Sequence, residues 1–133
     1  RDGVAVSELR AFLIAAEGQV GDDEQGLVGQ HGPHGTEQQF RLLAEQSVDR
    51  LILCGSNTDF CVDTTVRSAA AHGFEVLVLK DGHTTADRPH LSAEKIIEHH
   101  NWMWRHLDLP EGRRITLLTT DQLLEAAQPA LAC

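Results

Sequence analysis

The chain has 133 residues, of which 41% are hydrophobic and 23% charged, as expected for one soluble globular domain with its own core. Its net charge is −9 and no basic run stands out, which argues against a nucleic-acid or anionic-membrane surface. No apolar stretch is long enough to cross a bilayer, and the first residues do not have the pattern of a secretory leader. The number of cysteines, three, is odd, which argues against a framework of disulfides. We therefore expect a cytoplasmic, disulfide-free protein.

The first 35 residues give the weakest signals. Residues 7–17 are predicted as a helix with Ser7 as N-cap, and a strand over residues 11–15 is the competing interpretation. Residues 18–35 collect glycines and acids, which predicts a loop. A clearer helix follows, with Thr36 as N-cap, and it runs through Phe40, Leu42, Leu43 and Gln46.

A buried strand and a helix meet at a cysteine. Residues 51–54 are continuously apolar, as in a strand covered on both faces of a parallel sheet, and Gly55 permits a sharp turn. Helical spacing from Val62 to Ala71 places Cys61 in the first turn of a helix, where backbone N–H groups and the helix dipole favour a thiolate. The structural alternative is an inert core cysteine, which is how we interpret Cys54.

The rest of the chain alternates strand and helix. A buried strand over residues 75–80 ends at Asp81, and Ser92 caps a long helix that Pro110 prevents from continuing. A last strand covers residues 115–118, and Thr120 caps a short helix that Pro129 terminates. This alternation predicts an α/β fold with parallel strands, in one domain over residues 1–133.

Two stretches carry a family resemblance. Residues 55–65, Gly-Ser-Asn-Thr-Asp-Phe-Cys-Val-Asp-Thr-Thr, and residues 69–81 resemble the isochorismatase-like cysteine hydrolase superfamily. Residues 81–85 and 92–101 extend the match toward amidase-type members, whereas residues 1–35 match poorly. The resemblance implies a three-layer, Rossmann-like α/β fold, a parallel sheet with helices on both faces, here truncated so that N-terminal strands are lacking.

The first residues can be placed on the family pattern in two ways. In the preferred one, Arg1-Asp2-Gly3 follows the family's third strand, and the first three strands are absent. In the other, residues 11–15 are the first strand, and Glu17-Gly18-Gln19 replaces its Asp-x-Gln ending. The preferred placement leaves the edge of the strand over residues 51–54 open, which predicts a homo-oligomer.

The resemblance also implies a catalytic site. Cys61 would attack a carbonyl carbon, the backbone amides of Asn57 and Cys61 would form the oxyanion hole, and the Ser56–Asn57 peptide bond would be cis. No cofactor is implied, and no metal is expected because the family's metal-binding residues belong to the unmatched part. Asp81 and His83 follow a strand and form a candidate pocket, although His83 could equally pack inside the fold.

The sequence departs from the family at the two partners of the cysteine. The general base, an aspartate in the family, is missing unless Glu17 replaces it, and Gln30 is the nearest match to the family's lysine. Lys80 and Lys95 lie in the wrong segments. The leading hypothesis is a hydrolase that cleaves a small molecule's C–N amide bond through Cys61, with activity reduced or lost. The alternative is a non-catalytic truncated homologue that serves oligomerisation or interaction.

Overall fold

The computed structural model describes residues 11–17 and 33–131. Its elements in chain order are the strands and helices β1 (Ala11–Glu17), α1 (Pro33–Glu45), β2 (Arg50–Ser56), a π-helical turn (Thr58–Val62), α2 (Asp63–Ala71), β3 (Glu75–Thr84), α3 (Ala93–His106), a 3₁₀ turn (Pro110–Gly112), β4 (Thr116–Leu118) and α4 (Thr120–Leu131). No helix in these ranges is both long and apolar enough to traverse a bilayer.

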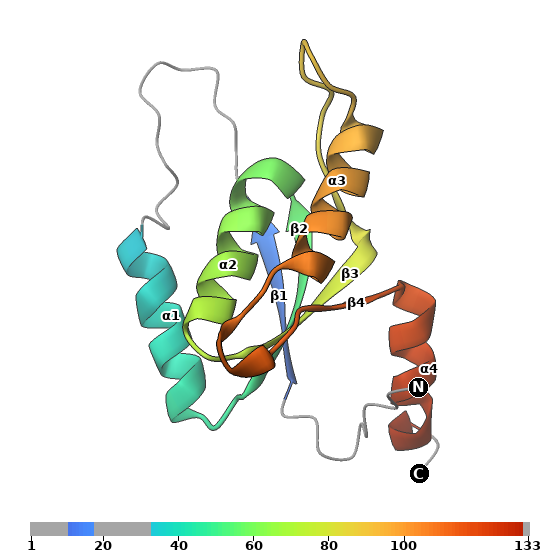
Figure 1. Cartoon of the computed structure of the whole chain (residues 1–133). Coiled ribbons are helices and arrows are strands. Elements are labelled where there is room, and N and C mark those ends of the chain that lie inside the picture. Colours follow the sequence, from blue (N-terminus) through green and yellow to red (C-terminus); the bar gives the residue numbers. More distant parts are fainter. Residues whose placement is uncertain (1–10, 18–32, 132–133) are drawn as a thin grey trace.

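The four strands form one parallel sheet in the order β1-β2-β3-β4 (Figure 1). β2 is therefore an interior strand, and its fully buried Leu51 and Leu53 fit the continuous apolar run that predicts such a position. Because parallel strands need crossover connections, helices follow the strands and cover the sheet.

Alternate residues of β2 and β3 face two separate cores. Leu51, Leu53, Val76 and Val78 pack with residues of α1, α2 and α3 in the larger cluster, which also contains Trp104. The neighbouring positions of the strands face the other side, where a smaller cluster includes Leu123 of α4; its buried members are Ile52, Leu77 and Leu79. The predicted three-layer α/β fold is confirmed, with α1, α2 and α3 on one face and α4 on the other (Figure 1).

The N-terminal helix prediction is wrong, because residues 11–17 form β1. This strand pairs with β2 from Ala11 opposite Arg50 to Glu17 opposite Ser56. The described sheet thus corresponds to the second placement of this region, with a strand beside the cysteine strand, while Arg1-Asp2-Gly3 lies outside the described residues. β2 has a neighbouring strand on each side, so the described sheet lacks the open edge from which a homo-oligomer was predicted.

Three helix boundaries also differ from the sequence prediction. α1 begins at Pro33, so Thr36 lies inside its first turn instead of capping it. Thr119, and not Thr120, caps α4: its hydroxyl accepts from the Gln122 N–H at 3.0 Å, and the Gln122 amide oxygen accepts from the Thr119 N–H. α4 also continues past Pro129 to Leu131. Ser92 caps α3 as predicted, since its hydroxyl accepts from the Lys95 N–H.

Candidate active site

Cys61 lies in the π-helical turn between β2 and α2, at the carboxyl end of the sheet. Its side chain is half-buried. The carbonyl oxygen of Asn57 accepts the N–H groups of Phe60 and Val62, both at 3.1 Å, which fixes the start of the turn. The Thr65 hydroxyl donates to the Cys61 carbonyl oxygen at 2.7 Å and joins the turn to α2. The cysteine is thus held where strand becomes helix.

The end of β2 departs from a regular strand immediately before this turn. The Ser56–Asn57 peptide bond is cis, at the position that the family resemblance gives for one. Gly55 has a φ of 121°, a conformation that a residue with a side chain rarely adopts. The pairing of β2 with β3 shifts here, so that Gly55 lies opposite His83. Irregular pairing of this kind redirects a strand end, and here it brings His83 beside the turn.

His83 is buried and forms a chain of hydrogen bonds. The Asn101 amide nitrogen donates to the Lys80 carbonyl, so its oxygen faces His83 Nε2 at 2.8 Å and accepts that ring's proton. His83 Nδ1 is then the acceptor for the Thr58 hydroxyl, also at 2.8 Å. Burial lowers the pKa of His83, against the opposing effect of the Asn101 hydrogen bond. His83 therefore links the cysteine turn to α3, with a hydrogen-bond partner at each ring nitrogen.

Asp81 is not brought together with His83 around a common site. Its carboxylate accepts the backbone N–H of Thr120 at 2.8 Å and the Thr120 hydroxyl at 2.9 Å, at the start of α4. These hydrogen bonds lower the pKa of Asp81. The two residues of the predicted pocket therefore have separate structural partners, one in the cysteine turn and one in α4.

The sequence analysis missed an ion pair next to Cys61. Arg88 donates from Nε to Asp59 Oδ2 at 2.9 Å and from Nη2 to Oδ1 at 3.0 Å, and Thr85 donates its hydroxyl to the same carboxylate at 2.7 Å. The Arg88 hydrogen bond, with smaller help from Thr85, lowers the pKa of Asp59 to about 2. Asp59 belongs to the quoted motif, but nothing in the sequence links it to a residue 29 positions later.

Glu17 and Gln30 are the candidate replacements for the family's general base and lysine. Glu17 is the last residue of β1, in register with Ser56, and β1 contacts the turn that carries Cys61. Gln30 lies outside the described residues. Lys95 pairs with Glu98 on an exposed face of α3, which agrees with its interpretation as a solvated side chain.

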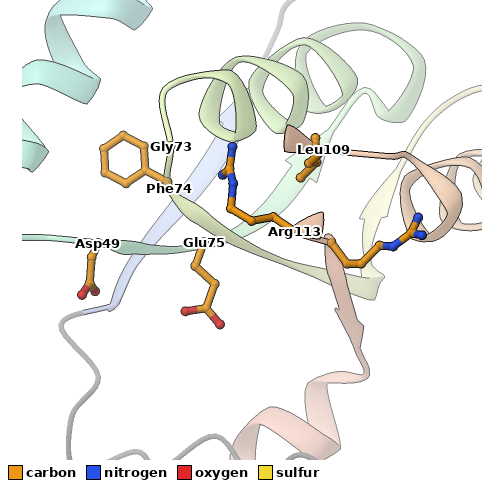
Figure 2. Close-up of a pocket in the computed structure, with 7 residues that line it drawn as sticks. Asp49, Gly73, Phe74, Glu75, Leu109 and Arg113 are labelled. Atoms are coloured by element: carbon orange, nitrogen blue, oxygen red, sulfur yellow. The ribbon is translucent and has the colours of Figure 1, made fainter. Parts of the chain in front are cut away.

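Two surface hollows lie away from Cys61. One of about 430 Å³ is at the amino ends of β2 and β3, where Asp49, Glu75 and Arg113 are among its lining residues (Figure 2). The other, of about 260 Å³, lies beside α1 and includes Phe40 and Phe74. Neither contains Cys61, which belongs to the carboxyl end of the sheet. Among the described residues, no three His, Cys, Asp or Glu side chains gather as a metal site would require.

The burial of His83, which lowers its pKa, predicts a pH-dependent stability. A native pKa below the unfolded value means that the unfolded chain takes up this proton first, so stability is present above about pH 6.5 and is lost as the pH falls. His100 adds to the lowering of the pKa, and Asp81 opposes it. Between about pH 7.5 and about pH 5.5, thermal unfolding should therefore show a larger fall in Tm for the unmodified chain than for His83→Gln. Equal falls would contradict this assignment.

Comparison with known proteins identifies relatives of this chain. The isochorismatase domain model matches residues 36–128. The uncharacterized isochorismatase family protein YddQ of Bacillus subtilis is 30% identical over 83 residues, covering 62% of this chain and 45% of that protein. A crystal structure of an isochorismatase family protein is 39% identical with a TM-score of 0.52, covering 62% of this chain and 46% of the other.

A cysteine hydrolase from Pseudomonas syringae shares the fold, with a TM-score of 0.57 at 23% identity, covering 70% of this chain and 43% of the other. The chain thus spans less than half the length of these relatives. The family match begins inside α1 and ends inside α4, and it includes the strand, turn and helix around Cys61. This chain belongs to the isochorismatase family.

Proposed function

We propose that this chain provides the nucleophile of an isochorismatase-family hydrolase that cleaves the C–N amide bond of a small molecule through Cys61. The observation that carries the proposal is the meeting of two strand ends: β1 ends at Glu17 opposite Ser56, and β2 leads from Ser56 into the cysteine turn. The carboxyl ends of adjacent parallel strands are where open α/β sheets hold their ligands.

The reaction requires a nucleophile and a proton carrier. The Cys61 sulfur forms a bond to the amide carbon, and the Glu17 carboxylate takes the thiol proton and gives it to the departing nitrogen as the C–N bond breaks. Water then attacks the thioester, its proton returns through Glu17 to sulfur, and the carboxylic acid is released. The backbone amides of Asn57 and Cys61 stabilise the oxyanion in both steps.

The proposal is tested by ammonia release from a panel of small primary amides, with mass spectrometry of the protein during turnover. We expect ammonia from at least one amide and an acyl adduct on the peptide that contains Cys61. Ammonia release that continues unchanged after Cys61 has been alkylated would exclude the covalent mechanism. The absence of ammonia and adduct with every amide would favour the alternative of a non-catalytic interaction domain.

Replacing Glu17 with glutamine should slow the reaction strongly, because the amide side chain cannot accept the thiol proton. General acid–base groups contribute about 100-fold to 10,000-fold, and kcat for the amide that gives the fastest ammonia release should fall by that factor. Glu98→Gln is the matched control, since Glu98 lies on an exposed face of α3 and pairs with exposed Lys95. Equal kcat values for the two variants would remove Glu17 from the mechanism.

A further inference from the structure

The end of β3 and the residues directly after it form one segment, residues 83–88, which contacts the cysteine turn at consecutive positions. Thr58 donates to His83, and Asp59 accepts from Thr85 and Arg88. The Arg88 guanidinium also lies over the ring of Phe60, 4.9 Å from its centroid. Thus each of the three residues immediately before Cys61 is held by a side chain from this one segment.

Arg88 makes the most directional of these contacts. Its two nitrogens bind both oxygens of Asp59, and Nη2 also donates to the Thr85 hydroxyl at 2.9 Å. The ion pair is largely shielded, with 22% of the Arg88 side chain and 18% of the Asp59 side chain exposed. A forked, two-bond contact fixes orientation as well as distance, which a lysine at the same place could not do.

Arg88 is itself presented by an ordered turn. Its N–H donates to the Leu91 carbonyl at 2.8 Å, and the Leu91 N–H donates back at 3.3 Å. The Asp87 carboxylate accepts the Ala93 N–H at 2.7 Å, which joins the turn to the start of α3. Because both ends of this contact are anchored, a shift of Arg88 would be transmitted to Asp59 and Phe60.

We propose that Arg88 is a positioning residue for Cys61: by fixing Asp59 and Phe60, it holds the turn so that the sulfur and the amides of Asn57 and Cys61 stay aligned for attack on a carbonyl. Its catalytic consequence rests on the proposed amide hydrolysis. Its effect on the thiol does not, because alkylation of Cys61 needs no substrate and its rate depends on the access to the sulfur and on its surroundings, which this turn sets.

The test compares alkylation of two cysteines in one chain. Iodoacetamide is added to the folded protein, and mass spectrometry of peptides gives the rate at Cys61 relative to Cys54, whose thiol pKa is raised by burial. Arg88→Gln and Asp59→Asn should each lower this ratio about tenfold or more, since small misplacements at a reacting centre have effects of that size. The double variant should lower it no further than either single variant, because both remove the same contact.

Two further variants separate positioning from a general effect on structure. Arg50→Gln breaks an ion pair of 2.7 Å with Glu75 at the opposite end of β2 and should leave the ratio unchanged. Arg88→Lys keeps the charge but not the fork and should resemble Arg88→Gln. If Arg88→Gln does not fold, Asp59→Asn decides, because its amide oxygen can still accept from Thr85. An unchanged or raised ratio in Asp59→Asn and Arg88→Gln would overturn the proposal.

Kinetics distinguish this proposal from the proposed function. On an amide that the chain hydrolyses, Arg88→Gln should lower kcat with little change in KM, because Arg88 acts on the nucleophile and not on the substrate. A kcat equal to that of Arg50→Gln would overturn the positioning role while the hydrolase remains. A lowered alkylation ratio in a chain that hydrolyses no amide would support the positioning role while the proposed function fails.

Discussion

Replacing Cys61 with alanine is expected to abolish the acyl adduct and to lower amide hydrolysis by about 10⁴-fold or more. The sulfur forms the bond to the substrate carbon in the proposed mechanism, and a methyl group at the same place cannot do so. The effect should appear in kcat, because the turn that holds Cys61 depends on backbone bonds of Asn57 and on side chains other than the thiol. Ammonia release and protein mass spectrometry measure the two losses.

Cys54→Ala is the matched control for this variant. Cys54 ends the apolar run of β2, packs against the cluster of Ile52, Leu77 and Leu79, and lies seven positions before the candidate nucleophile. Its replacement removes a thiol from β2 and leaves the residues of the cysteine turn unchanged. We expect kcat within about twofold of the unmodified chain, as for a change outside the reacting groups. Hydrolysis that survives in Cys61→Ala but not in Cys54→Ala would reassign the nucleophile.

Replacing Trp104 with alanine should destabilise the fold by roughly 3–5 kcal/mol, as for other large-to-small changes of buried aromatic residues. Trp104 is fully buried in the larger core cluster. Its indole N–H donates to Asp63 Oδ1 at 2.9 Å, and its ring contacts those of His83 and His100. The variant therefore creates a cavity, and it removes one of the hydrogen-bond donors to the Asp63 carboxylate.

Trp102 provides the control on the same helix. Its side chain is 60% exposed, and it stacks on the ring of His106. Trp102→Ala should change stability by less than about 0.5 kcal/mol, because surface substitutions rarely do more. Urea unfolding followed by far-UV circular dichroism gives both free energies. A loss of similar size in the two variants would contradict the packing assigned to Trp104.

Local patterns in the sequence predict the central part of the fold well. The apolar runs of β2 and β3 and the helical spacing after Cys61 reflect burial against near neighbours, and each gives an element of the expected type. Ser92 is predicted as a cap because its hydroxyl bonds within its own helix turn. These features depend on residues a few positions apart, so the sequence alone contains the information.

Features that depend on distant residues could not be predicted in this way. The apolar stretch at residues 11–15 fits a helix or a strand, and only its pairing with β2, some 40 residues later, selects the strand. The Asp59–Arg88 pair likewise joins segments 29 residues apart. The burial of His83 follows from the shift in pairing at Gly55, which no periodicity indicates. The sequence thus indicates Cys61 as a candidate nucleophile but does not indicate the side chains that hold its turn.

The two outer strands of the described sheet differ in length, which affects where a further strand could pair. β4 has three residues, whereas β1 has seven. An extra strand, from this polypeptide or from a second copy, would therefore find more than twice as many backbone donors and acceptors along the outer side of β1 as along β4. Within the described residues the longer outer strand is the one that ends at Glu17, so a strand paired with it would lie next to the proposed proton carrier.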